Sequence, residues 1–202
     1  MDTNALFNIN YGLYMLTAQL GEKDNGCIIN TVMQVTSTPM PVCVVAVNKQ
    51  NYTHDMLVQS KQFNVSVLTT QAPFALFERF GFQSGAQADK FADYAQIKRS
   101  GNRLITLTEH INAWLSFAVT QTMDFGTHTL FRAELVDSAV LNNEKSLSYA
   151  HYHKHIKPKP QAAQNKGWRC EICNYVHQDA TLPADFICPI CKHGASDFVE
   201  LT

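Results

Sequence analysis

Two Cys-x-x-Cys pairs near the end of the chain constrain its fold more than any other feature. Fourteen residues separate the pairs, whose four cysteines are Cys170, Cys173, Cys188 and Cys191. Four thiolates at this spacing can occupy the corners of one tetrahedron, which is the ligand set of a mononuclear zinc or iron site. The surrounding segment is too short to bury a large core, so we expect metal and aromatic side chains together to hold it folded.

The segment from Gly167 onward resembles rubredoxin in the runs Trp168-Arg-Cys-Glu-Ile-Cys-Asn-Tyr-Val and Cys188-Pro-Ile-Cys. The resemblance implies one iron ion held by the four cysteines and the transfer of single electrons. The stretch between the pairs is shorter than in free-standing rubredoxins. The glycine usual after each second cysteine is replaced by Asn174 and Lys192, and lysine adopts the expected positive φ less readily than glycine. A structural zinc ribbon therefore remains an alternative.

The composition of the whole chain is that of an ordinary soluble globular protein. The chain has 202 residues, 46% of them hydrophobic, and a formal net charge of −1. No apolar run approaches the ~18 residues needed to span a membrane. The start, Met-Asp-Thr-Asn, lacks the basic region of a signal peptide. Six cysteines, four of them in the two pairs, suit a reducing cytoplasm better than a disulfide-bonded secreted domain.

Charge is distributed unevenly between the two parts of the chain. From Trp168 onward the net charge is −3, and the rest of the chain carries +2. This is the wrong sign for a zinc ribbon that binds nucleic acid, because such a ribbon needs lysine and arginine for the phosphates. We expect an acidic carrier that docks on less acidic partners and no nucleic-acid partner. Cys27 and Cys43 lie in apolar stretches and are predicted to be core residues rather than nucleophiles.

Strand patterns dominate the first three quarters of the chain, and no alternation of strands with helices appears. The pattern predicts two helices, Asn51–Gln62 with Thr53 as N-cap and 73–80 beginning at a proline. The fold class is therefore mainly β, a barrel with a few inserted helices plus a small metal knuckle domain. The other predicted elements are a hairpin turn over 21–26 that ends in Asn-Gly and strands over 11–18, 27–36, 41–48, 63–68, 113–122 and 127–140.

The domain organisation follows from these patterns. We expect a barrel over residues 1–154, a linker rich in lysine and proline over 155–166, and the metal module over 167–202. His151, His153 and His155 lie at alternate positions just before the linker. They would share one face of a strand, but we expect no metal site there.

Polar residues stand among the apolar strands of the predicted barrel. They are Asn30, Thr31, Gln34 and Thr36, followed by the run Asn48-Lys-Gln-Asn-Tyr-Thr53. Amides and hydroxyls can hydrogen-bond a flat heterocycle and its sugar chain without adding charge, and a helix that begins near Thr53 offers N–H groups to a phosphate. Outward-facing strand positions would explain the same pattern, and the pattern alone favours that simpler explanation.

Several separate motifs over about residues 3 to 155 resemble the flavin reductase-like split barrel. They are Tyr11-Gly-Leu-Tyr-x-Leu-Thr, Asn25-Gly-Cys-Ile-Ile-Asn-Thr-x-x-Gln-Val-Thr, Asn48-Lys-x-Asn-Tyr-Thr, Phe63-Asn-Val-Ser-Val-Leu, Ser84-Gly85, Asp89-Lys-Phe91 and His128-Thr-Leu-Phe. That family binds FMN, usually as a homodimer with the flavin sites near the subunit interface. The resemblance therefore implies an FMN-binding split barrel and a homodimer.

The resemblance also implies roles for particular residues. Ser84 and Lys90 would close over the flavin phosphate, although relatives often have arginine at the position of Ala86. His128 would lie near the flavin and the nicotinamide as a catalytic residue, with a structural role at a strand end as the alternative. Contacts to the isoalloxazine and ribityl chain fall to Asn30, Thr31, Gln34, Val35 and Thr36, and contacts to the ribityl and phosphate end to Asn48, Lys49, Asn51 and Thr53.

A flavin barrel joined to a rubredoxin-like module resembles the high-molecular-weight rubredoxins. The resemblance implies that NAD(P)H reduces bound FMN, that FMN reduces a four-cysteine iron site, and that iron reduces a soluble acceptor. By the same resemblance the acceptor is a flavodiiron protein, which reduces O₂ or NO. One alternative is a flavin reductase with a structural zinc ribbon, and another is a non-enzymatic electron carrier reduced by another protein. The choice between NADH and NADPH stays open, as does transfer within one chain or across a dimer.

Overall fold

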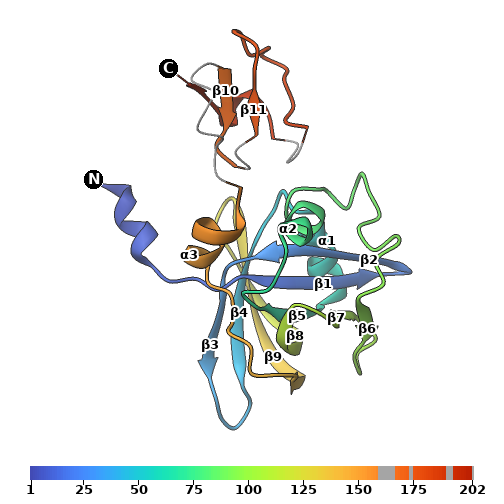
Figure 1. Ribbon diagram of the computed structural model, residues 1–202. Helices are drawn as coiled ribbons and strands as arrows, with labels where there is room; N and C mark the ends of the chain where they lie inside the picture. Colours follow the sequence, from blue (N-terminus) through green and yellow to red (C-terminus); the bar gives the residue numbers. More distant parts are fainter. Residues whose placement is uncertain (159–166, 173–174, 190–192, 202) are drawn as a thin grey trace.

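The computed structural model describes residues 1–158, 167–172, 175–189 and 193–201. A large β domain is formed by the first of these ranges, and a small three-stranded unit by the others (Figure 1). Two of the predicted metal ligands, Cys173 and Cys191, lie outside the described residues.

A seven-stranded antiparallel sheet forms the large domain, in the order β2-β1-β5-β8-β9-β4-β3. Figure 1 shows β1 and β2 running across the direction of β3 and β4, so the sheet curls and its two edge strands lie apart. The mainly β architecture predicted from the sequence is confirmed. The strand bounds are Tyr14–Leu20 (β1), Lys23–Ile29 (β2), Val32–Thr36 (β3), Val42–Asn48 (β4), Gln62–Leu68 (β5), Ile111–Asp124 (β8) and His128–Val140 (β9). Two short strands, Ile97–Arg99 (β6) and Ile105–Leu107 (β7), form a separate pair.

The curled sheet encloses one apolar core and carries a second core on its other face. Inside, the rings of Phe63 and Phe117 stack with centroids 5.0 Å apart, and Phe131 is fully buried beside them. On the other face, Phe77 and Phe80 of helix α2 pack with Met15, Leu68 and Trp114. Cys27 and Cys43 belong to the inner core, so the prediction that they are core residues is confirmed.

The two predicted helices form, but the first differs at both ends. Helix α1 spans Tyr52–Ser60, and the N-cap position is Asn51 rather than Thr53. Lys61 is the C-cap residue, with a left-handed φ of 57°, and the next residue already belongs to β5. Thr53 is fully buried in the first turn. Helix α2 spans Phe74–Gly81 with Pro73 at its N-cap, and a 3₁₀ helix, Thr3–Asn8, precedes the sheet.

The first hairpin turns earlier than the Asn-Gly pair predicted. Gly21 adopts a φ of +60° and begins the turn that joins β1 to β2. Asn25 and Gly26 lie inside β2, paired with Ala18 and Thr17. The predicted hairpin forms, but its turn is shorter than residues 21–26, because Gly21 supplies the left-handed conformation four residues before Asn25.

The segment with three histidines is helical. A short helix α3 spans Tyr149–His151 and continues as a π-helix over Tyr152–Ile156, which includes the first two residues of the predicted linker. The rings of His151 and His155 lie 4.5 Å apart, whereas His153 packs against Tyr149. Within the described part of the chain, no three metal-ligating side chains gather there or elsewhere.

The metal module contains a three-stranded sheet in the order β11-β10-β12. Its strands are Gly167–Cys170 (β10), Val176–His177 (β11) and Phe198–Leu201 (β12), with a 3₁₀ helix over Ala195–Asp197. Cys170, Cys188 and Phe198 form its buried core. None of the described helices is both long and apolar enough to cross a membrane.

Candidate functional site

A cavity of about 400 Å³ opens where the ends of β2 and β4 meet the start of α1 and the end of α2. Three side-chain amides face it, from Asn30, Asn48 and Asn51, together with the imidazole of His128. Ligand sites commonly combine a cavity of this size with a few polar groups on an apolar wall. The apolar part of the wall comes from Leu13, Ile28, Ile29, Ala46, Phe77, Phe82 and Ile172.

A tight turn places two of these amides at the start of α1. The side-chain oxygen of Asn48 accepts from the backbone N–H of Gln50 at 2.9 Å, and the backbone N–H of Asn51 donates to the carbonyl of Asn48 at 3.0 Å. The chain then enters α1 with Asn51 at the N-cap. Since the first N–H groups of a helix have no partner inside it, this end of α1 favours an anion.

A buried hydrogen bond joins α1 to β2 beside this turn. The Asn25 amide donates to the hydroxyl oxygen of Thr53 at 2.9 Å, and both side chains are buried. Gly85 lies against Asn25, since a Cβ at that position would come within 2.3 Å of the Asn25 side-chain oxygen. The loop after α2 can approach Asn25 on β2 this closely only because residue 85 has no Cβ.

Lys90 is a buried cation next to the same elements. Its side chain is 3% exposed, and its ammonium donates to the carbonyl oxygens of Gly26 at 2.9 Å and Phe80 at 3.2 Å. Among the described residues, no carboxylate forms a salt bridge with it. Burial lowers the pKa of Lys90, and the negative charge of a nearby Cys27 thiolate raises that pKa to a lesser extent. Burial likewise raises the pKa of Cys27, although hydrogen bonds with Thr53 and the charge of Lys90 lower it.

Lys49 and His128 are held by the hairpin between β8 and β9. The Lys49 ammonium forms a salt bridge with Asp124 at 2.7 Å, so this lysine is directed at the hairpin. Hydrogen bonds from Lys49 and from the Gly126 N–H lower the pKa of Asp124. The Nδ1 atom of His128 lies 2.9 Å from the Thr127 hydroxyl, which orients the ring at the cavity wall.

A buried histidine that the sequence analysis did not single out fixes α1 on the sheet. His54 has its Nε2 atom 2.8 Å from the Thr129 hydroxyl and its Nδ1 atom 2.9 Å from a carboxylate oxygen of Asp55. Its ring also meets Phe131 edge to face at 5.8 Å. Because Thr129 follows His128 on β9, this link sets the distance between the start of α1 and the cavity wall.

Three predicted flavin contacts on β3 do not reach the 400 Å³ cavity of their own chain. Gln34, Val35 and Thr36 are exposed, and the Thr36 hydroxyl donates to the carbonyl of Met40. Thr31 donates to the Asn30 side chain at 3.1 Å and lines a neighbouring hollow with Tyr11. The structure thus brings together Asn30, Asn48, Asn51 and His128, with Thr53 and Lys90 buried close behind them.

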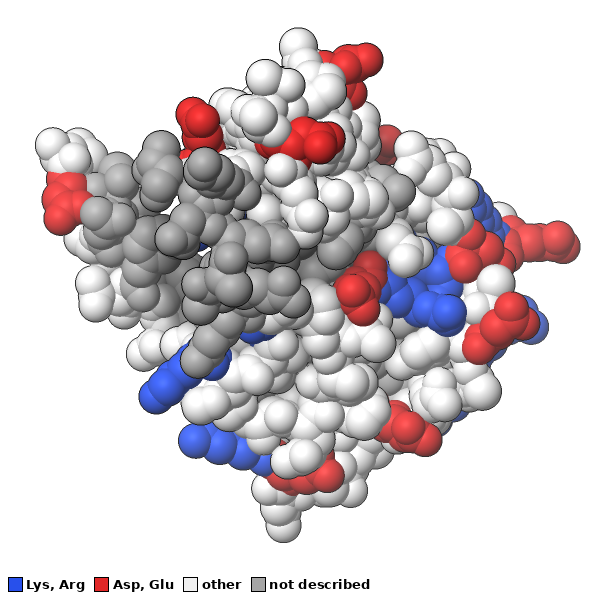
Figure 2. Space-filling model, turned by 45° about the horizontal axis from the view of Figure 1, so that its top comes forward, with Lys and Arg blue, Asp and Glu red and all other residues white. Residues whose placement is uncertain are grey.

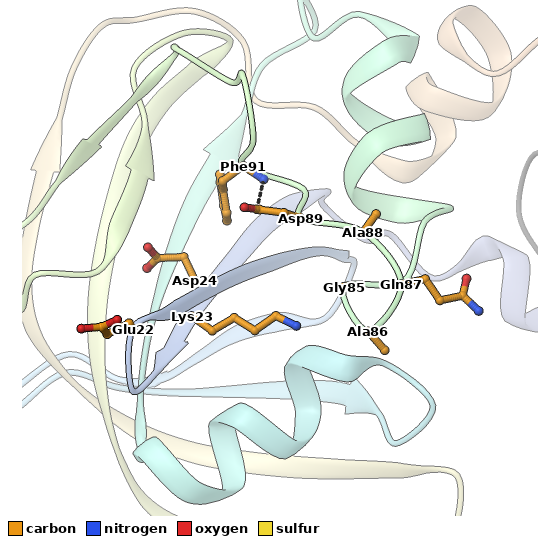
Figure 3. Close-up of a pocket in the computed structure, with 9 residues that line it drawn as sticks. All are labelled: Glu22, Lys23, Asp24, Gly85, Ala86, Gln87, Ala88, Asp89 and Phe91. Atoms are coloured by element: carbon orange, nitrogen blue, oxygen red, sulfur yellow. Dashed lines mark hydrogen bonds between the residues drawn. The ribbon is translucent and has the colours of Figure 1, made fainter.

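A second cavity, of about 620 Å³, lies between the β1–β2 turn and the loop after α2 (Figure 3). Figure 3 shows the side chain of Lys23 extending toward that loop, and Asp89 accepting from the N–H of Phe91 at 2.9 Å. The hydroxyl of Ser84 accepts from the N–H of Ala86, so Ser84 stabilises its own loop. Carboxylates of Glu22, Asp24 and Asp89 make this cavity unlike a phosphate site.

The C-terminal helical segment supplies cavity residues that the sequence analysis missed. Tyr149, Tyr152, His153 and Lys157 all line the 400 Å³ cavity. Tyr149 and Tyr152 are three residues apart, and the Ser148 hydroxyl accepts from the N–H of His151 as a helix cap. This helical spacing after a serine was the available signal.

In the metal module, the two described cysteines occupy equivalent positions. The N–H of Cys170 donates to the carbonyl of Tyr175, and the N–H of Cys188 donates to that of His193, each at 2.8 Å. Both bonds span five residues, and both cysteines are 0% exposed in one cluster. Two buried thiols with matching backbone hydrogen bonds suit a tetrahedral thiolate site, and this donor type suits iron or zinc.

Figure 2 views the face on which the metal module lies. Acidic and basic side chains are interspersed over its described residues, without an extended basic patch. This charge pattern offers no continuous track for a phosphate backbone.

Two family models match the chain. The flavin reductase like domain covers residues 6–158, and the rubrerythrin, rubredoxin-like domain covers residues 168–199. A relative from Moorella thermoacetica, named high molecular weight rubredoxin, is 37% identical over 232 aligned positions that include 100% of both chains. The chain belongs to the high-molecular-weight rubredoxin family.

Other relatives match the large β domain of this chain. A ferric-chelate reductase (NAD(P)H) from Archaeoglobus fulgidus is 39% identical and covers 79% of this chain and 93% of its own. The solved NADH:FAD oxidoreductase of Streptomyces globisporus shares the fold with a TM-score of 0.63 at 19% identity, covering 71% of this chain and 84% of its own. The larger domain therefore belongs to the flavin reductase like family, and the smaller domain is rubredoxin-like.

The residues present suit both a flavin and a metal ion held by thiolates. Uncharged amides around a partly apolar cavity suit a flavin ring, and a helix start with a buried lysine close behind it suits a phosphate. Cys170 and Cys188 suit half of a thiolate site. Flavin binding and a rubredoxin-like thiolate site were both predicted from the sequence, and the family matches support them. The choice of FMN and the individual contacts to FMN and iron stay predictions.

We predict that Lys90 makes the unfolding free energy of the cofactor-free protein increase with pH in the alkaline range. A lysine whose folded pKa is lowered costs stability while charged, and the cost disappears as the pH rises from the folded pKa toward the ordinary value of 10.5. The stability of wild type relative to Lys90→Met should therefore rise over that interval, as measured by urea unfolding at several pH values. The exposed control Lys145→Met should show no such relative change, and a flat Lys90→Met difference would contradict the prediction.

Proposed function

We propose that the protein is an electron-transfer oxidoreductase in which NAD(P)H reduces FMN in the 400 Å³ cavity and FMN reduces iron in the metal module. The iron then reduces a soluble acceptor, which we take to be a flavodiiron-type protein in the cytoplasm. The observation that carries the proposal is that the cavity wall contains a residue of the first cysteine loop, Ile172. A site for a two-electron carrier thus borders a site for a one-electron carrier.

The side chains of the cavity would bind and orient FMN. Bound FMN supplies a ring that takes hydride from a nicotinamide and gives up electrons singly. The amides of Asn30, Asn48 and Asn51 can both donate and accept hydrogen bonds, so they can hold the ring edge and the ribityl chain. The first turn of α1 can hold the phosphate, with the positive charge of Lys90 nearby. His128, oriented by Thr127, is the candidate contact with the flavin or the nicotinamide.

The cysteines of the metal module would hold iron through four thiolates. Iron in such a site supplies a one-electron couple whose potential depends on hydrogen bonds to sulfur and on burial. Cys170 and Cys188, the two cysteines that the structure describes, are fully buried, so their sulfur atoms are shielded from water. The rings of Phe186 and Phe198, 5.3 Å apart and edge to face, exclude water from the same cluster.

A second copy of the chain would cover an apolar face beside β3. Met33, Val35, Met123 and Phe125 are each more than half exposed. A hollow of about 220 Å³ between β3, β4 and the β8–β9 hairpin is lined by Val35, Val42, Val44, Met123 and Leu130. Exposed apolar surface of this kind marks an association site. The predicted flavin contact Val35 belongs to this face, which supports a homodimer with flavin near the interface.

We expect Asn51→Asp to weaken FMN binding at least about tenfold, because a carboxylate at the start of α1 repels a phosphate. Aspartate caps a helix as well as asparagine does, so the fold should be preserved. Titration of FMN fluorescence measures the affinity. Gln50→Glu adds the same charge at the neighbouring exposed position and should bind FMN nearly as wild type does. Equal affinity of Asn51→Asp and wild type would place the phosphate elsewhere.

The proposed function predicts two spectral steps after anaerobic mixing with NADH or NADPH. Flavin absorbance should bleach first and ferric thiolate absorbance second. Cys170→Ser should lose the iron signal and acceptor reduction while flavin still bleaches, because only the thiolate site is broken. Cys43→Ser, which also removes one thiol, should keep both steps. A colourless zinc-loaded module would favour a flavin reductase with a structural ribbon, and flavin that neither nucleotide reduces would favour a carrier reduced by another protein.

For the dimer, we expect Val35→Glu to give a monomer at micromolar concentration, because a buried unpaired carboxylate disfavours association. Light scattering during size-exclusion chromatography measures the mass. Val140→Glu introduces the same charge at a 79% exposed valine near the far end of the β8–β9 pair and should leave the mass unchanged. A monomeric wild-type protein would refute the homodimer.

A further inference from the structure

Ile172, a residue of the first Cys-x-x-Cys pair, forms part of the wall of the flavin cavity. Ile172 lies between Cys170 and Cys173 in the sequence and is partly buried. It lines the same 400 Å³ cavity as Asn30, Asn48 and His128 of the barrel. The described residues therefore place no further layer of protein between this loop and the cavity.

On the barrel, Phe82 makes the corresponding contact with the cysteines of the metal module. It follows α2 directly, lines the cavity, and packs against the buried cluster of Cys170, Cys188 and Phe198. The ring of Phe74 lies 5.9 Å from that of Phe82 and limits its movement. One aromatic side chain of the barrel is thus in contact both with the flavin cavity and with the core of the metal module.

The connection between the two parts is short enough to favour contact within one chain. Eight residues separate Pro158 from Gly167, so these two residues can be at most about 30 Å apart. A short tether raises the local concentration of an attached module to about the millimolar range. A contact made by Phe82, Ile172 and a few neighbours can therefore hold the docked state without the large interface that two separate proteins would need.

We propose that the metal module docks on the barrel of its own chain through Phe82 and Ile172, and that electrons pass from flavin to iron within that chain. This inference rests on the proposed function and adds the route. Each transfer would move one electron from the reduced flavin to a ferric ion, which becomes ferrous. Two such transfers would oxidise the flavin fully and release its protons to solvent, with the acceptor reoxidising the iron between them. Phe82 and Ile172 are positioning residues that keep the cysteine loop at the cavity.

Photo-crosslinking tests the docking without any turnover. Phe82 is replaced by p-benzoyl-phenylalanine in the full-length protein, which is irradiated and analysed by denaturing gel and peptide mass spectrometry. We expect links to residues 167–189 in the band of monomer mass. The same replacement at Phe125, which is 60% exposed at the β8–β9 hairpin, should give no such link. Links confined to the band of dimer mass, or no link to the module, would overturn the proposal.

The reciprocal replacement at Ile172 guards against a folding defect at Phe82. It should link to barrel residues around the cavity, again at monomer mass. Failure of the proposed function has a different signature, since flavin that neither NADH nor NADPH reduces leaves the crosslinking result unchanged.

Kinetics test the route. After anaerobic reduction of the flavin, the rate constant of iron reduction should be independent of protein concentration. In Ile172→Ser the rate constant should fall at least about tenfold relative to the flavin step in the same mixing experiment, because the serine no longer holds the module at the cavity. A tenfold loss corresponds to about 1.4 kcal/mol. Ile187→Ser changes an isoleucine that is 56% exposed next to Cys188 and should retain the wild-type rate ratio. A rate that rises with protein concentration, or an unchanged ratio in Ile172→Ser, would overturn intrachain transfer.

Discussion

The buried hydrogen bond from Asn25 to Thr53 is the constraint on which the 400 Å³ cavity depends. It fixes the first turn of α1 against β2, and Gly85 and Lys90 then bring the loop after α2 to the same place. His54 fixes the other side of α1 to β9. Three elements distant in sequence thus meet around one helix start. Because buried polar groups are costly when unpaired, few alternative arrangements of these side chains are available.

The strands were predictable because one face of each meets a core. The near-continuous apolar run in β4 and the alternation in β5 gave bounds close to those of the structure. Local turn chemistry was less reliable, since Gly21 rather than Asn25-Gly26 makes the hairpin turn. Thr53 resembles an N-cap residue, but it is drawn into the interior, and Asn51 takes the cap position. In both cases tertiary packing decided between two locally acceptable residues.

The kind of site could be predicted from the sequence more readily than its shape. The amides at Asn30, Asn48 and Asn51 were found because family motifs contain them. The partners of Lys49 and Lys90 could not be foreseen, since a salt bridge to Asp124 and two backbone carbonyls depend on the folded hairpin and on α2. Phe82 and Ile172 both line the cavity although they are about ninety residues apart in the chain, and no rule of sequence spacing predicts such a contact.

If the flavin phosphate binds beside Lys90 as proposed, the supply of the cofactor affects the abundance of the folded protein. The empty polypeptide carries the desolvation cost of an ammonium group whose described partners are only carbonyl oxygens. An anionic group arriving at that place offsets this cost, and a ligand that binds only the folded form shifts the folding equilibrium by mass action. Chains made when flavin is scarce would therefore spend more time unfolded and be more exposed to proteolysis.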